Sequence, residues 1–236
     1  MREGGLVPWS ERAVVRPLAG LALVALALVA AQASEAQVER YPHNVQKLPP
    51  RIQTLLKERA WRPGCPVPLS GLRLVTVAHW GWDGKARLGQ LVVHRDAAVP
   101  MTKVFRRLYE LKFPIRHMQL TDIYGPKSAR PAGGDVTGAF FCRQSVPSPC
   151  TGGTRSGRWS NHAYGLAIDI NPLENPYVGC GMTRDPEALR YVDRTPLRKG
   201  MVTPAVVSAF RAIGWGWGGA WSGETKDYMH FSHNGR

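Results

Sequence analysis

The sequence predicts an α+β protein, with a small antiparallel sheet, flanking helices and long loops. Residues 72–78 and 89–94 are rich in β-branched residues and flank a turn signal, which is typical of a β-hairpin. Apolar residues between 98 and 112 recur at helical spacing. The expected helices and strands follow one another without a regular strand–helix–strand order, which argues against a parallel sheet.

Length and composition are those of a folded chain with an anionic partner. The 236 residues are 44% hydrophobic and 20% charged, which excludes a disordered or collagen-like chain and suggests one domain, at most two. The net charge of +14 predicts binding to nucleic acid, a membrane surface or an anionic wall polymer.

The N-terminus narrows this choice because it has the pattern of a secretory signal. Arginines precede an apolar run, 18–31, and small residues then allow cleavage after Ala33 or Ala36. The run is shorter than the ~20 apolar residues of a membrane span, and an uncleaved tether is the alternative. We expect 1–36 to be a signal peptide. The protein would then be exported, to the cell wall, the periplasm or the extracellular space, with no stable membrane span after cleavage and no nucleic-acid partner.

The exported part is expected to begin with a flexible lead-in, 37–62, that contains one short helix, 52–61. The globular domain would then span 63–236. Proline, glycine and a capping threonine set the bounds of its later elements. These are, in chain order, the helix 98–112 ended by Pro114, a strand at 118–123, loops at 125–136 and 144–158, a buried strand at 165–170, a helix from Thr203 to Ala212 ended by Gly214, a Trp/Gly loop at 214–221 and a last strand at 227–232.

Four cysteines lie in the exported part, at Cys65, Cys142, Cys150 and Cys180. An even number in an oxidising compartment predicts two disulfides, with three possible connectivities. No C-x-x-C pair is present, which argues against a zinc finger.

Three side chains could form a catalytic zinc site on the sheet. His162, Asp169 and His230 would supply two imidazoles and one carboxylate, and one zinc ion with three protein ligands keeps a position for water. Residues seven apart point to opposite faces of a straight strand, so the site requires a bend at Gly165. His233, three residues after His230, is the nearest alternative ligand, and we expect it to be solvated.

Asp227 and Arg143 would complete the chemistry. A carboxylate that is not a ligand can take a proton from water and pass it to the leaving amine, and Asp227 is placed for this role. It lies three residues before His230, so a turn or bulge must separate them. Arg143 could hold the developing oxyanion or a substrate carboxylate.

These segments together resemble the VanY-type zinc D-alanyl-D-alanine carboxypeptidases, a family that includes L-alanyl-D-glutamate endopeptidases. The motif S-x-H-x-x-G-x-A-x-D is met from Ser160 to Asp169, and the acid three residues before a histidine is met by Asp227. The likeness covers nearly all of 62–232.

The resemblance implies a role for each residue. His162, Asp169 and His230 would bind zinc, and Asp227 would be the general base and then the acid. Arg143 would polarise the carbonyl, and Ser160 would hydrogen-bond near the substrate. The resemblance also implies a disulfide between Cys65 and Cys142, which leaves Cys150 with Cys180. The segment 134–139 and the loop 144–158 depart from the family, which puts substrate contacts there in doubt.

Two function classes follow. The first is a secreted zinc peptidase that hydrolyses peptidoglycan stem peptides, with removal of a terminal D-alanine favoured over a cut between L-alanine and D-glutamate. Anionic cell-wall polymers would be its further partners. The alternative is a non-catalytic, cationic wall-binding module with a structural zinc, but such a module has no use for Asp227.

Overall fold

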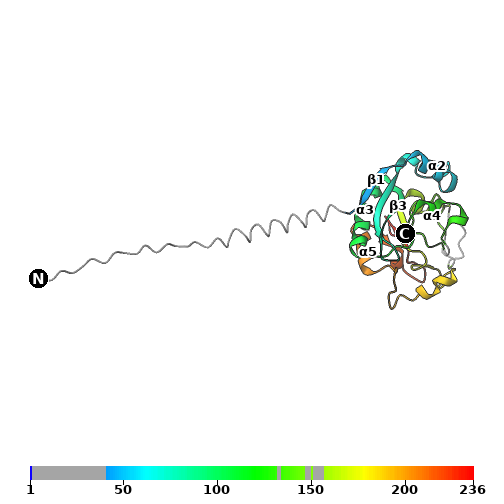
Figure 1. The fold of residues 1–236 in the computed structure, drawn as a ribbon. Helices are drawn as coiled ribbons and strands as arrows, with labels where there is room; N and C mark the ends of the chain where they lie inside the picture. The colour runs from blue at the N-terminus through cyan, green and yellow to red at the C-terminus, as the bar shows by residue number, and fades with distance from the viewer. Residues whose placement is uncertain (2–40, 132–133, 147–149, 151–156) are drawn as a thin grey trace. The chain divides into compact units, whose positions relative to one another are not determined.

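The larger sheet is built on the expected hairpin. The computed structural model describes residues 1, 41–131, 134–146, 150 and 157–236 (Figure 1). β2 (Leu72–Trp80) pairs antiparallel with β3 (Ala86–His94), and β1 (His43–Lys47) adds to the other edge of β2. The signal peptide predicted at 1–36 lies, apart from Met1, outside the described residues and stays a prediction.

The region expected to be a flexible lead-in, as far as it is described, is part of the fold. After β1, α2 (Pro50–Arg59) buries Ile52 and Leu56 in a core cluster with β2. The domain boundary therefore lies before β1 rather than near residue 63, and Pro42–Arg236 forms one unit. The sequence did not indicate β1 because four of its five side chains are exposed, so the strand has no alternating apolar pattern.

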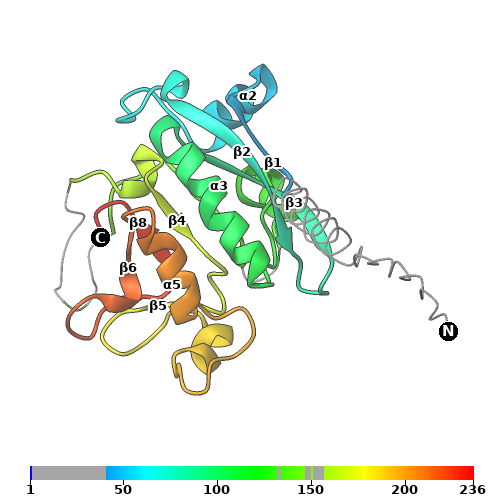
Figure 2. The ribbon, with the colours of Figure 1, turned by 90° about the vertical axis from the view of Figure 1, so that its left-hand side faces the viewer.

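Two further helices pack against each other, and the first of them packs next to the larger sheet. α3 (Arg95–Glu110) runs along β2, as Figure 2 shows, and buries apolar residues at helical spacing that include Val104, Phe105 and Leu108. α5 (Pro204–Arg211) contacts α3, and the Thr203 side chain caps it by accepting from the Val206 amide. The two helices predicted from the sequence are thereby confirmed.

Residues 118–123, expected to be a strand, instead lead into the short helix α4 (Leu120–Tyr124). The reason is local capping. The side chains of Gln119 and Asp122 bond each other's backbone amides, which satisfies two amides at the start of the helix.

Two small sheets carry the C-terminal half. β4 (Ala167–Asp169) and β6 (Gly216–Trp217) both pair with β8 (His230–Ser232), and β5 (Tyr177–Val178) pairs with β7 (Lys226–Asp227). Phe231 of β8 stacks on Phe210 of α5 with ring centroids 3.8 Å apart, which joins the first of these sheets to the helix layer. Short 3-10 helices span Leu69–Gly71, Lys127–Ala129, Asn161–Tyr164, Pro186–Tyr191 and Gly218–Ala220.

The architecture is α+β with small antiparallel sheets, as predicted. Within the described residues, no helix has the length and apolar character needed to cross a membrane.

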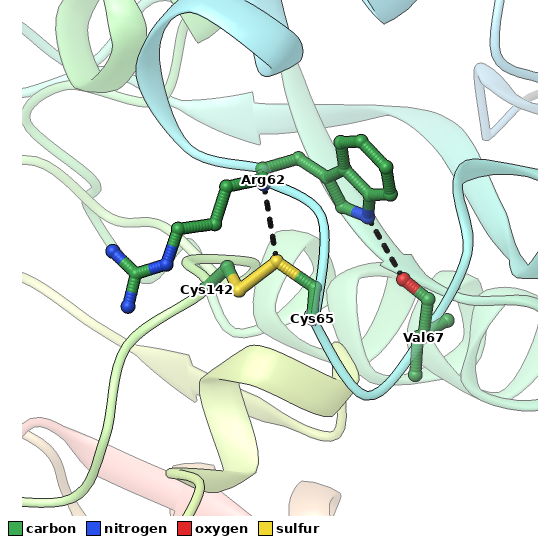
Figure 3. The surroundings of a disulfide bond; sticks show 5 residues. Arg62, Cys65, Val67 and Cys142 are labelled. Carbon is green, nitrogen blue, oxygen red and sulfur yellow. Dashed lines mark hydrogen bonds between the residues drawn. A yellow bond between two sulfur atoms is a disulfide. The ribbon is translucent and has the colours of Figure 1, made fainter.

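Both disulfides join distant parts of the chain. Cys65 bonds Cys142 across 77 residues, and Cys150 bonds Cys180 across 30 residues, which are the pairs that the resemblance implies. Figure 3 shows the first bond, whose Cys65 sulfur accepts from the Arg62 amide at 3.2 Å. Cys142 is buried in the same core cluster as α2, so the bond ties the residue before Arg143 to the core.

Candidate active site

His162 is placed by a tight turn rather than by a strand. It lies in the 3-10 helix Asn161–Tyr164, where the Ser160 side chain accepts from the His162 amide at 3.3 Å. Gly165 then adopts a left-handed conformation, with φ 68°, and leads the chain into β4. A Cβ at this position would lie 2.5 Å from the backbone nitrogen of His94, so only glycine fits. This is the bend that the spacing of the two ligands requires.

Asp169 and His230 face each other across two strands. They are direct partners in the antiparallel pairing of β4 with β8. The Asp169 Oδ1 and His230 Nδ1 atoms are 3.1 Å apart. Tyr228 and Met229 form a turn between β7 and β8, and this turn separates Asp227 from His230 as the site requires.

The ligand atoms of His162, Asp169 and His230 lie within 4.8 Å of one another. His162 Nε2 is 3.3 Å from His230 Nδ1 and 3.3 Å from Asp169 Oδ2. His162 Nδ1 lies 2.6 Å from the Ala139 carbonyl, which can only accept, so Nδ1 carries the proton and Nε2 presents its lone pair. His230 Nε2 contacts the main-chain oxygen of Arg236 at 3.2 Å, which leaves Nδ1 for the cluster in the same way.

The Asp169 carboxylate is ionised in this cluster. Burial alone would raise its pKa, but the electrostatic interactions and hydrogen bonds with His162 and His230 outweigh burial and hold the pKa well below its usual range. The cluster therefore offers one anionic oxygen and two imidazole nitrogens.

Asp227 lies beside the cluster in a different environment. Its Oδ1 atom is buried without a hydrogen-bond partner among the described residues. Burial raises the pKa of Asp227 to about 7, and the negative charge of Asp169 adds to this effect. His230 and Arg143 act in the opposite direction. A carboxylate with a pKa near neutral can both accept and release a proton.

These residues share one cleft of about 780 Å³. Ser160, His162, Asp169, Asp227 and His230 line it, together with Arg143. Arg143 is half-buried, and its guanidinium makes one long hydrogen bond within the described residues, to the Gln144 carbonyl at 3.4 Å, so other N–H donors face the cleft. The structure thus brings together all six residues that the sequence singled out.

A comparison with protein families identifies the segment that carries this site. Residues 154–233 match the family model described as D-alanyl-D-alanine carboxypeptidase. This segment is similar to that family. The match supports the resemblance to VanY-type peptidases, and the matched segment includes His162, Asp169, Asp227 and His230. No match was found among curated proteins or among solved structures.

Several contributors to the site were not predicted. The Ala139 carbonyl orients His162, and Trp221 lies 6.0 Å from the His230 ring and lines the cleft.

Two residues considered in the sequence lie outside the site. Asp135, in the segment where substrate contacts were in doubt, is instead buried in an ion pair with Arg116. His233, the alternative ligand, is exposed and lies outside the cluster. No spacing rule connects these residues, because their partners are remote in the sequence.

Proposed function

We propose that the chain is an exported zinc peptidase that hydrolyses stem peptides of peptidoglycan, and that it removes a terminal D-alanine. The observation that carries the proposal is the half-buried Asp227, whose Oδ1 atom is buried without a hydrogen-bond partner among the described residues and which lines the same cleft as the His–Asp–His cluster. A structural metal site needs no such group, whereas hydrolysis needs a proton carrier.

The cluster fits zinc by its donor set and geometry. Two imidazole nitrogens with free lone pairs and one carboxylate oxygen are the ligands of many catalytic zinc sites. His162, Asp169 and His230 would hold the ion. When bound, zinc supplies Lewis acidity that activates water and polarises the scissile carbonyl.

The protein's own residues would perform the remaining steps. Asp227 takes a proton from the attacking water and delivers it to the leaving amine, which is consistent with its raised pKa. Arg143 donates hydrogen bonds to the carbonyl oxygen as negative charge develops there. Ser160 lies at the same cleft and hydrogen-bonds near the substrate.

The charge of the cleft favours a substrate with a free carboxylate. Four arginines line it (Arg143, Arg158, Arg184 and Arg236), against three aspartates (Asp169, Asp185 and Asp227), and arginine binds carboxylates through two parallel hydrogen bonds. A carboxypeptidase must hold the terminal carboxylate of its substrate, whereas an endopeptidase has no such need.

The test is to incubate the protein with isolated muropeptides, with and without a chelator, and to identify the products by mass spectrometry. We expect chelator-sensitive loss of the terminal alanine, and at least about a hundredfold lower kcat/KM when the terminal carboxylate is amidated. A cut between L-alanine and the next residue, insensitive to amidation, would identify an endopeptidase. Absence of product with zinc bound would favour the wall-binding module.

A further inference from the structure

A second charged cluster lies behind the cleft and has no part in the chemistry above. Arg116 pairs with two carboxylates, at 2.9 Å between Nε and Asp135 Oδ2 and at 2.6 Å between Nη2 and Glu174 Oε1. The Asp135 side chain is 1% exposed and Glu174 is fully buried, whereas the Arg116 side chain that joins them is 28% exposed. We call these three residues the buried ion triad. Burying such charges costs free energy that an apolar cluster would not, so their presence needs a reason.

The triad is attached to one side of the cleft. Pro172, Leu173, Pro176 and Tyr177 line the cleft, and we call them the cleft wall. Glu174 and Asn175 lie between Leu173 and Pro176 in the chain. Both side chains are fully buried and do not line the cleft, so they point away from it. The wall therefore depends on the anchoring of these two inward side chains.

The contacts of the triad with the wall are direct. Asp135 Oδ1 accepts from the Leu173 amide at 3.0 Å, and the Arg116 amide donates to Asn171 Oδ1 at 3.3 Å. Glu174 lies between the wall residues Leu173 and Pro176 in the chain, and its Oε1 atom accepts a hydrogen bond from Arg116 Nη2.

The triad is also fixed on its other side. The Arg116 guanidinium lies 3.7 Å from the centre of the Trp82 ring, whose segment joins β2 to β3. The triad thus links the wall to the larger sheet through two ion pairs, of which the contact between Arg116 Nη2 and Glu174 Oε1 is also a hydrogen bond. Hydrogen bonds to buried charges are strong and geometrically demanding, so they fix position better than apolar packing.

We propose that the buried ion triad is a positioning unit for peptide binding: it holds the cleft wall at the spacing that the bound peptide requires, and so acts on affinity rather than on bond cleavage. The inference rests on the proposed function. None of the three residues lines the cleft, so each acts through the wall and not through contact with the substrate.

The experiment is run at about pH 8.5, where Glu174 is ionised, and uses the full chain with Glu174→Gln, which keeps the shape of the side chain and removes its charge. We expect KM for a stem pentapeptide to rise about tenfold with kcat within about twofold, because a charge-assisted bond is lost behind the wall only. Bound metal should be unchanged, and amide exchange should become faster at residues 171–178. Asp135→Asn, which removes the other carboxylate, should give the same split between KM and kcat.

The matched control is Glu187→Gln, an exposed acid on the neighbouring 3-10 helix, which should alter none of these quantities. An unchanged KM in both triad variants, or an equal loss of kcat and metal, would overturn the inference. If the wild type cleaves no stem peptide, the proposed function fails. Calorimetric Kd values for the same pentapeptide then decide: a Kd weakened about tenfold in Glu174→Gln supports the positioning role, and an unchanged Kd refutes it.

Discussion

At the scale of single residues, the site separates two aspartates by their environments. Asp169 is stabilised as an anion by His162 and His230, whereas the Oδ1 atom of Asp227 is buried without a hydrogen-bond partner among the described residues, and burial raises the pKa of Asp227 to about 7. The same residue type is thereby suited to metal binding in one place and to proton transfer in the other.

Replacing Asp227 by asparagine tests the second role. The amide is close to the carboxylate in size but cannot accept a proton from water, so we expect kcat to fall by about a thousandfold. Metal content should stay the same, since Asp227 is outside the ligand cluster. Asp83→Asn, at an exposed turn, serves as the control and should keep full activity. Turnover retained by Asp227→Asn would exclude it as the general base.

The two C-terminal histidines test the ligand set. We expect His230→Ala to weaken zinc binding by at least about a hundredfold, because one of three protein ligands is lost. His233→Ala should bind zinc as the wild type does, since His233 is exposed and outside the cluster. Metal content after dialysis against a competing chelator distinguishes them. Equal loss of zinc in both variants would refute the assignment.

Whether the position of a site residue can be predicted from the sequence depends on whether its contacts are local or come from distant segments. His162, Asp169 and His230 could be found from the sequence by their ligand chemistry and by the resemblance of the motifs that contain them, although the spacing of His162 and Asp169 required a bend at Gly165. Asp135 could not be assigned in the same way. Its partners Arg116 and Glu174 come from other segments, and nothing in the local sequence indicates that its carboxylate turns inward.

At the scale of elements, the turn before β4 positions the first ligand. Gly165 has φ 68°, and a Cβ there would lie 2.5 Å from the His94 nitrogen. We expect Gly165→Ala to destabilise the fold by about 3 kcal/mol and to reduce zinc binding, through backbone strain and overlap together. Gly84 also has positive φ but has no neighbour within 4 Å of the added Cβ. Gly84→Ala should therefore cost only about 1 kcal/mol in urea unfolding. Equal costs would contradict a close approach at Gly165.

The buried ion triad gives the fold a dependence on pH. Burial raises the pKa of Glu174 to about 7, the Asp135 charge adds to this, and Arg116 opposes it. The Glu174 carbonyl accepts from Arg194, and Tyr191 interacts electrostatically with Arg116. The folded state therefore holds a proton that the unfolded chain releases at lower pH, and the stability it contributes is lost as pH rises towards about 7.

The variant Glu174→Gln mimics the protonated acid and should lack this dependence. Between about pH 5 and pH 7, the stability of the wild type relative to the variant should fall, by at most about 1.4 kcal/mol per pH unit for one proton. Urea unfolding of both proteins across this range measures it. Parallel pH profiles would show that Glu174 does not titrate there.

The elements differ in how well the sequence predicts them. The hairpin β2–β3 and the helix α3 follow strong apolar periodicity, and the structure confirms them. β1 is mostly exposed and owes its place to backbone pairing with β2, while α4 depends on a capping box that competes with its β-branched residues. A strand held mainly by backbone pairing with its neighbour, or a short helix fixed by its capping residues, shows little apolar periodicity in its sequence.

At the scale of the whole molecule, the net charge of +14 predicts retention on anionic cell-wall polymers. Such binding is electrostatic and should weaken as salt shortens the screening length from about 30 Å at 0.01 M to about 3 Å at 1 M. We expect the protein to bind isolated walls at low salt and to be released as salt increases.

Removing zinc with a chelator should leave the release profile unchanged, because the charge is spread over the chain rather than confined to the cleft. Asp227→Asn, whose kcat we expect to be about a thousandfold lower, keeps the wall largely intact during the measurement. Binding that persists at 1 M salt would show that specific contacts, rather than net charge, hold the protein to the wall.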